Sequence, residues 1–324
     1  MIFQQIISIC LTLADILMPS FHYLSGISKM DKSEFITFIK QKRIAIGDGA
    51  TGTNLMQAGL PSGLTSEHWV LENPEAILNL HRSFIESGVD IITTSTFGGS
   101  RMRLDQSGLS AQFEDINRKA VEIARRAAEG TDVLVAASMG PLGHMLKPMG
   151  LLEPEEAEDQ YRAQADILAE SGADLIVIET QFDIHEASAA VRGALSAADI
   201  AVVCFFSYDR GTRTMMGVKP QDAAEAMNDS GICALGINCG KSLDDNFRVL
   251  NELARVTELP IWFKPNAGLP RVSASGVTEY DIDPHSMAAG VSDWIGAGAR
   301  VIGGCCGTSP SHLKAIADQV HALR

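Results

Sequence analysis

Two adjacent cysteines near the C-terminus, Cys305 and Cys306, are the residues best suited to chemistry in this sequence. They follow a short apolar run at 301–302 and two glycines, and the helix-start pattern Thr308-Ser309-Pro310 comes soon after them. The pattern predicts a strand that delivers two thiols to a strand-to-helix turn. Neighbouring cysteines rarely bridge each other, because the disulfide strains the peptide between them, whereas both sulfurs can enter one coordination sphere. The pair therefore indicates a metal site that needs a third ligand.

Cys239 is the best candidate for that ligand, because it follows the apolar run 234–237 and precedes a glycine. The other cysteines fit less well: Cys10 lies near the N-terminus, Cys204 inside an apolar run and Cys233 ahead of a strand. Three thiolates select zinc and leave a fourth position open, which favours catalysis. The alternative is that the three are small buried hydrophobic residues, although packing does not readily explain glycine-flanked cysteines at two strand ends.

Polar side chains end other apolar runs in the same way. Glu179 closes the run 175–178, where an acid without a ligand or partner would be costly to bury. Asp48 follows the run 43–46 among glycines that allow close approach of the backbone. The alternatives are a structural ion pair for Glu179 and a turn aspartate for Asp48. Hydroxyl groups end a further run, at Thr94, Ser95 and Thr96.

Short apolar runs alternate with helix-length segments along most of the chain. The runs predicted as strands are 43–46, 90–94, 133–137, 175–178, 201–206, 234–237, 261–264 and 301–302. A first helix is predicted from Ser33, and later ones over 76–87, 114–128, 154–170, 184–197, 220–229, 243–256, 286–296 and 311–323. Such alternation is what a (β/α)8 TIM barrel requires, and an open doubly wound sheet is the alternative. In a barrel, all three cysteines would project at the C-terminal face, where barrel enzymes keep their chemistry.

Composition narrows the class of protein. The 324 residues are 46% hydrophobic, which is ample for a large core, and carry a net charge of −14. That charge argues against nonspecific binding to nucleic acid. Six cysteines in a chain of this size do not resemble a secreted disulfide scaffold, so a reduced, cytoplasmic protein is expected. The sequence predicts no oligomeric state.

The N-terminus differs from the rest of the chain. The stretch 6–18 is apolar but too short to span a bilayer, and no Lys or Arg precedes Lys29 to form the basic end of a signal peptide. Met30-Asp31-Lys32-Ser33 resembles an ordinary start. We therefore predict an N-terminal extension over 1–29, disordered or outside the native start, and one barrel domain over 30–324. Membrane tethering by the extension is the alternative.

Four motifs resemble those of the homocysteine S-methyltransferase family. They are Asp-Gly-Ala-Thr-Gly-Thr at 48–53, Thr-Ser-Thr-Phe-Gly at 94–98, Gly-Ile-Asn-Cys at 236–239 and Gly-Gly-Cys-Cys-Gly-Thr at 303–308. The family includes betaine–homocysteine methyltransferase and the homocysteine-binding module of cobalamin-dependent methionine synthase. The resemblance implies a zinc-binding barrel, which the spacing argument reached independently.

The resemblance also implies roles for single residues. The zinc ligands would be Cys239, Cys305 and Cys306. Glu179 would bind the ammonium group of homocysteine. The other substrate-contacting or site-shaping residues would be Asp48, Thr94, Ser95, Thr96 and Asn238.

Two further positions concern the fourth zinc ligand. Animal betaine enzymes carry a tyrosine directly after the acid of strand four, able to occupy the zinc when substrate is absent, whereas this chain has Thr180. Methionine synthase modules use an asparagine in a segment similar to Pro-Asn-Ala-Gly at 265–268. Asn266 is therefore the candidate for the resting fourth ligand.

The implied activity is methyl transfer to a zinc-bound homocysteine thiolate, which yields methionine. The implied donor is betaine, because the stretches 97–101, 139–143 and 213–217 look most similar to standalone bacterial betaine–homocysteine S-methyltransferases. A quaternary cation favours aromatic faces, and the candidates are Trp69, Phe97 and Tyr208, with ordinary packing as the alternative for each.

Other functions remain open. The chain could be the homocysteine module of a split cobalamin-dependent methionine synthase, or it could use S-methylmethionine or dimethylsulfoniopropionate as donor. The non-enzymatic alternative is a zinc- or homocysteine-binding barrel without turnover. The expected partners are homocysteine and a small methyl donor, with no nucleic acid and no membrane.

Overall fold

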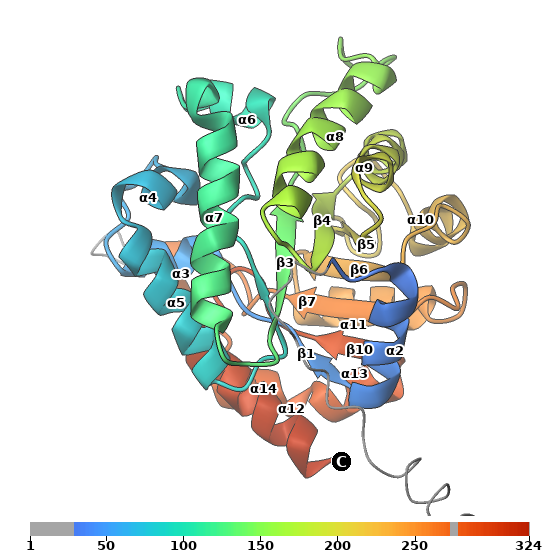
Figure 1. Cartoon of the computed structure of the whole chain (residues 1–324). Coiled ribbons are helices and arrows are strands. Elements are labelled where there is room, and N and C mark those ends of the chain that lie inside the picture. The colour runs from blue at the N-terminus through green and yellow to red at the C-terminus, as the bar shows by residue number, and fades with distance from the viewer. Residues whose placement is uncertain (1–28, 273–277, 324) are drawn as a thin grey trace, which may run out of the picture.

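A barrel of eight parallel strands organises the fold (Figure 1). The computed structural model describes residues 29–272 and 278–323. The barrel strands are β1 (Ala45–Ile46), β2 (Ile91–Thr93), β3 (Leu134–Met139), β4 (Leu175–Gln181), β5 (Ala201–Phe206), β6 (Ala234–Cys239), β7 (Ile261–Pro265) and β10 (Ala299–Ile302). They pair in the order β1-β10-β7-β6-β5-β4-β3-β2, and a parallel bridge between Gly47 and Ile91 joins β1 to β2. The sheet therefore closes on itself, which confirms the predicted (β/α)8 barrel.

Helices surround the strands. After β1 come α3 (Thr51–Gln57), α4 (Ser66–Glu72) and α5 (Pro74–Glu86), and after β2 come α6 (Arg101–Gln106) and α7 (Phe113–Ala128). The helices that follow β3 to β6 are α8 (Pro154–Glu170), α9 (Ile184–Ala197), α10 (Pro220–Met227) and α11 (Leu243–Leu253). The last three are α12 (Pro284–Ala289), α13 (Val291–Gly296) and α14 (Pro310–Ala322), and α2 (Lys32–Lys42) precedes β1. A small antiparallel hairpin, β8 (Pro270–Val272) and β9 (Thr278–Tyr280), follows β7.

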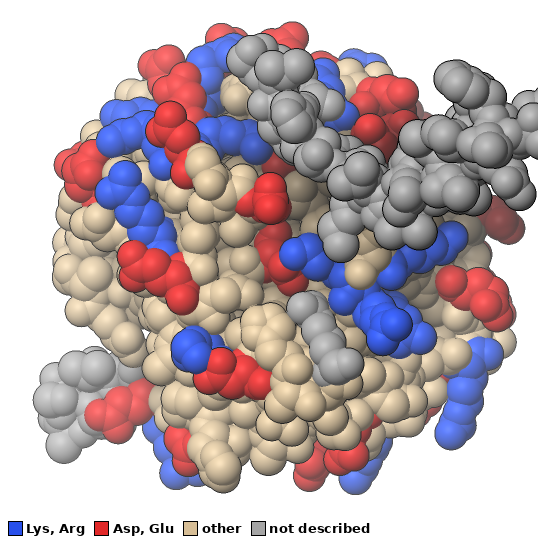
Figure 2. Space-filling model, turned by 60° about the horizontal axis from the view of Figure 1, so that its bottom comes forward, with Lys and Arg blue, Asp and Glu red and all other residues tan. Residues whose placement is uncertain are grey.

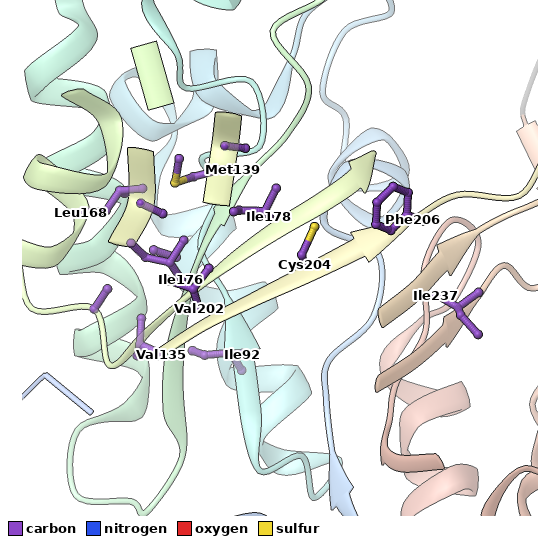
Figure 3. Packing of buried hydrophobic residues seen from close by; sticks show 14 of the residues in the cluster. Ile92, Val135, Met139, Leu168, Ile176, Ile178, Val202, Cys204, Phe206 and Ile237 are labelled. Atoms are coloured by element: carbon purple, nitrogen blue, oxygen red, sulfur yellow. The ribbon is translucent and has the colours of Figure 1, made fainter. Parts of the chain in front are cut away.

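The outward-facing side chains of the strands pack against the helices. Val135, Ile176 and Val202 belong to one buried hydrophobic cluster with Leu168 of α8, and Figure 3 shows them close together between β3, β4 and β5. Successive strand residues face opposite sides of a sheet. The residues between these positions must therefore face the barrel interior.

The interior-facing residues form a second buried cluster, which includes Val177 and Trp262. Phe35 and Ile39 of α2 join this cluster, and the backbone N–H of Ala201, the first residue of β5, donates to Met30 O just before α2. Helix α2 therefore closes the amino-terminal end of the barrel. Toward the carboxyl ends of the strands the same inward positions become polar, at Thr93, Ser138, Glu179, Asn238 and Lys264.

The predicted elements differ from the observed ones in one long helix and in several short elements. The helix predicted over 286–296 is two helices that meet at Gly290, where an added Cβ would lie 2.7 Å from the Trp294 ring. The first of them begins early because the Asp283 side chain caps it by accepting from Ser286 N. The short helices α3, α4 and α6 and the β8–β9 hairpin were not predicted, since segments this short carry little periodicity.

The surface of one face is shown in Figure 2, where acidic and basic side chains lie interspersed with uncharged ones. The negative net charge is therefore not concentrated on this face. Within the described ranges, no helix is long and apolar enough to cross a membrane. The N-terminal extension predicted over 1–29 lies, except for Lys29, outside the described residues.

Candidate metal and substrate site

The three predicted thiols lie together at the carboxyl ends of β6 and β10. The sulfurs of Cys239, Cys305 and Cys306 all lie within 4.8 Å of one another, and Cys239 Sγ is 3.0 Å from Cys305 Sγ. All three are free cysteines. Each of the three is partly exposed rather than fully buried, which favours a ligand role over the alternative of small buried hydrophobic residues.

Backbone geometry holds the thiols in place. Cys239 has a φ of 55° and Gly240 a φ of 80°, both in the left-handed region, which an L-residue such as cysteine adopts only at a cost. The Asn246 side chain donates to Cys239 O at 2.6 Å, and Cys305 N donates to Pro265 O of β7 at 2.9 Å. The end of each thiol-bearing strand is thereby tied to its surroundings.

The chemistry of the thiol cluster suits a cation. Hydrogen bonds with the other two sulfurs lower the pKa of Cys306 to about 3 and raise the pKa of Cys239 well above its usual value. Sulfurs packed this closely compete for protons, and a metal ion can take the place of those protons. Three sulfur ligands suit zinc better than magnesium or calcium, which prefer oxygen ligands.

Asn266, the candidate fourth ligand, lies close to the cluster. Its Nδ2 donates to Gly240 O at 2.9 Å, and the next residue, Ala267, donates its backbone N–H to Cys306 O. Asn266 Oδ1 is buried and has no hydrogen-bond partner among the described residues. A buried carbonyl oxygen without a partner is costly, so this atom is available to a ligand.

Glu179 and Asp48 converge on a lysine that the sequence analysis did not assign to the site. Lys264 Nζ lies 2.9 Å from Glu179 Oε1 and 3.7 Å from Asp48 Oδ1, and the lysine is 3% exposed. Ser138 Oγ donates to the other oxygen of Glu179 at 2.6 Å. The sequence feature that could have indicated this residue is that a lysine ends the apolar run 261–264. Its partners, Glu179 on β4 and Asp48 just after β1, are far away in sequence.

Asp48 is fully buried, and its position is fixed by β2. Thr93 donates to it from the backbone N–H at 2.6 Å and from the hydroxyl at 2.9 Å. Burial raises the pKa of Asp48 to about 6, while Lys264 opposes that rise. The residue is therefore more than a local turn aspartate, because it links β1, β2 and β7. Its contact with homocysteine stays a prediction.

The hydroxyl groups after β2 have two different environments. Thr94 and Thr96 share a hydrogen bond of 2.6 Å, and Thr96 also donates to Ser138 O, so both tie β2 to β3. Ser95 is 2% exposed, and its Oγ has no hydrogen-bond partner in the part of the chain that the structure describes. Ser95 is therefore the one of the three whose hydroxyl remains available to a bound molecule.

The aromatic candidates for the methyl donor separate in the structure. Trp69 and Tyr208 are buried in the hydrophobic cluster that surrounds the barrel, which agrees with the alternative that they serve ordinary packing. Phe97 is 38% exposed, and its ring lies over Gly140.

A further aromatic residue, Tyr280, was not predicted to lie at the site. A Cβ added at Gly307 would lie 2.2 Å from its ring, so Tyr280 packs directly beside the Cys305–Cys306 turn. Burial and the neighbouring sulfurs raise the pKa of Tyr280 to about 12. No sequence pattern identified this residue, since it belongs to the unpredicted β8–β9 hairpin.

Fold and site together define a closed (β/α)8 barrel whose strand ends gather three thiols able to hold a metal ion. Comparison with known proteins identifies the family of the chain. The sequence model described as homocysteine S-methyltransferase matches residues 45–320. The chain belongs to the homocysteine S-methyltransferase family.

Several relatives are similar over most of the chain. The methionine synthases of Mycobacterium tuberculosis and Mycobacterium leprae are 31% and 30% identical to it over 88% and 86% of its length. The chain spans about a quarter of the length of these proteins, 25% and 24%. The crystal structure of the homocysteine methyltransferase MmuM from Escherichia coli in its metallated form is 27% identical, with a TM-score of 0.74, over 87% of this chain and 98% of that one.

Proposed function

We propose that this protein is a zinc-dependent homocysteine S-methyltransferase that produces methionine. The observation that carries the proposal is the cluster of Cys239, Cys305 and Cys306 beside the buried acid Glu179. A free aliphatic thiol is mostly protonated at neutral pH and is a weak nucleophile in that form. When bound, zinc supplies a Lewis acid that lets a substrate thiol lose its proton near neutral pH.

The residues around the cluster would orient the substrate. Glu179 is 8% exposed and so remains within reach of a ligand, and it would accept from the α-ammonium group of homocysteine. Lys264 and Ser138 already hold its two oxygens in place. The Ser95 hydroxyl, which is buried without a partner among the described residues, would accept from or donate to the amino-acid end of the substrate. The substrate sulfur would then point to the thiol cluster.

The methyl donor that we propose is betaine. The S–CH3 bond forms as the N–CH3 bond breaks, and the nitrogen keeps the electron pair, so a quaternary cation leaves as a neutral tertiary amine. Phe97 is the candidate aromatic group with an exposed ring to face that cation. A methylated corrinoid is the second candidate, favoured by the similarity of the chain to methionine synthases.

The test is a methyl-transfer assay on purified, zinc-loaded protein with homocysteine. Betaine, S-methylmethionine, dimethylsulfoniopropionate and methylcobalamin are supplied in parallel, and methionine is measured by mass spectrometry. Methionine from betaine, lost in Cys305→Ala and retained in the buried control Cys204→Ala, supports the proposal. Methionine from methylcobalamin alone assigns the second donor. Zinc binding without methionine from any donor refutes methyl transfer and favours a binding protein.

A further inference from the structure

Thr180 and Asn238 form a reciprocal pair of hydrogen bonds beside the thiol cluster. Thr180 N donates to Asn238 Oδ1 at 3.0 Å, and Asn238 Nδ2 donates to Thr180 Oγ1 at 2.7 Å. Thr180 lies on β4 and Asn238 on β6, two strands that β5 separates in the barrel. Because the partners directly follow Glu179 and precede Cys239, the pair connects the substrate-facing acid to a thiol.

The backbone at Thr180 is arranged to make this pair. Thr180 has a φ of 63°, in the left-handed region that a β-branched residue adopts only where its surroundings enforce it. The pairing of β4 with β5 shifts register between Ile178 and Gln181. The irregularity frees the Thr180 N–H from the strand ladder, and the N–H donates to Asn238 instead. Such local strain commonly marks a functional site.

The pair fixes which way the Asn238 amide points. A backbone N–H can only donate, so the oxygen of the amide must face Thr180 N. The amide NH2 group then faces the Thr180 hydroxyl and the sulfurs. Its nitrogen lies 3.8 Å from Cys239 Sγ and 4.0 Å from Cys305 Sγ. Asn238 is 1% exposed.

We propose that Thr180 is a positioning residue of the metal centre, acting through Asn238 to hold an amide N–H toward the sulfurs of Cys239 and Cys305. An amide N–H directed at both sulfurs is an outer-shell contact, and such contacts hold metal ligands in the orientation that the metal requires. Without the Thr180 hydroxyl, the amide loses the contact that holds its NH2 group in place. The inference rests on the metal centre of the proposed function.

The test compares a substitution that removes the hydroxyl with one that keeps it. Thr180→Val keeps the β-branched shape and its backbone preference but removes the hydroxyl, whereas Thr180→Ser keeps the hydroxyl. Zn²⁺ affinity is measured by competition with a chromophoric chelator, and thiolate-to-metal charge-transfer absorption is measured on the Co²⁺-loaded protein. We expect Thr180→Val to bind Zn²⁺ about 10–100-fold more weakly and to shift the Co²⁺ band, as loss of an outer-shell partner does elsewhere. Thr180→Ser should have nearly the Zn²⁺ affinity and the Co²⁺ absorption of the wild-type protein.

Substitution of Asn238 tests whether Thr180 acts on the metal centre through the Asn238 amide. Asn238→Ala should reproduce the effect of Thr180→Val, and the double variant should bind Zn²⁺ no more weakly than Asn238→Ala alone, because both changes remove one interaction. Thr180→Gly removes the hydroxyl and also removes the strain of the left-handed backbone conformation. It should match Thr180→Val in Zn²⁺ affinity, which keeps the test valid if Thr180→Val unfolds.

Three results would overturn the inference. They are wild-type Zn²⁺ affinity and Co²⁺ absorption in Thr180→Val and Thr180→Gly, equal losses in Thr180→Ser and Thr180→Val, and additive losses in the double variant. Metal binding is measured without any methyl donor, so failure of methyl transfer leaves this comparison intact. Wild-type protein that binds no Zn²⁺ would refute the proposed metal centre first, and this inference with it.

Discussion

Replacement of Lys264 by methionine removes a buried cation that faces both Asp48 and Glu179 across the barrel. The lysine is 3% exposed, and it lies 2.9 Å from Glu179 Oε1 and 3.7 Å from Asp48 Oδ1. Removal of one partner of a buried ion pair leaves an uncompensated charge, and its cost is about 3–5 kcal/mol of unfolding free energy. Methionine has a similar length and no charge, so little of that cost arises from a cavity.

The unfolding free energy that Lys264→Met loses should depend on pH in a defined direction. Burial already raises the pKa of Asp48 to about 6, from 3.8, against the opposing effect of Lys264, and the pKa rises further once the lysine is gone. A folded-state pKa above the unfolded value means that the folded protein binds the proton more tightly. Stability therefore falls as pH rises through the folded-state pKa, and Lys264→Met should lose more at alkaline pH than at acidic pH.

The assay is urea unfolding of reduced, metal-free protein at about pH 5.5 and about pH 8. Lys314→Met is the matched control, because Lys314 pairs with Asp318 at the surface, where both side chains are more than half exposed. The control should lose no more than about 0.5 kcal/mol at either pH. Equal losses in the two variants, or a Lys264→Met deficit that does not grow toward alkaline pH, would refute the reasoning.

Three further substitutions test other parts of the structure. His81 is fully buried, both its ring nitrogens lack a partner among the described residues, and burial lowers its pKa to about 4. The His81 imidazole should therefore contribute a loss of about 3 kcal/mol of stability as pH falls from about 6.5 to 4, so in thermal unfolding the wild-type protein should lose stability relative to His81→Leu by about that amount over this range. A Cβ at Gly236 would lie 2.1 Å from the Phe205 ring, so Gly236→Ala should destabilise the barrel by about 1–3 kcal/mol in urea unfolding, and an unchanged midpoint would contradict this. Ser95→Ala should raise the KM for homocysteine several-fold with kcat retained, and steady-state kinetics with unchanged KM would remove Ser95 from the substrate site.

Local pattern was enough to predict the barrel and the thiol cluster. Each strand is a short apolar run, and each thiol follows such a run. The location of each thiol at the end of a strand could therefore be predicted without knowing which strands are neighbours. The carboxyl ends of parallel strands lie at one face of a barrel. Cys239 and the Cys305–Cys306 pair could therefore be brought together although 66 positions separate Cys239 from Cys305.

Partners across the barrel could not be predicted in the same way. The run 261–264 contains Lys264, but the lysine's role depends on which acids face it, and those are Asp48 just after β1 and Glu179 on β4. The left-handed conformation of Thr180 has no signature in a residue type that normally avoids it. Tyr280 belongs to a hairpin too short to carry a pattern.

The sequence by itself thus determined the fold class and the cluster of three thiols, because hydrophobic period and strand-end chemistry are properties of contiguous residues. The family followed separately, from the resemblance of four short motifs. Only the tertiary structure decided that Glu179 and Asp48 share Lys264, that Thr180 orients the Asn238 amide, and that Trp69 and Tyr208 are packed in the core. These features depend on the register between strands and on backbone angles at their ends. Both arise when the barrel closes and distant strand ends come into contact.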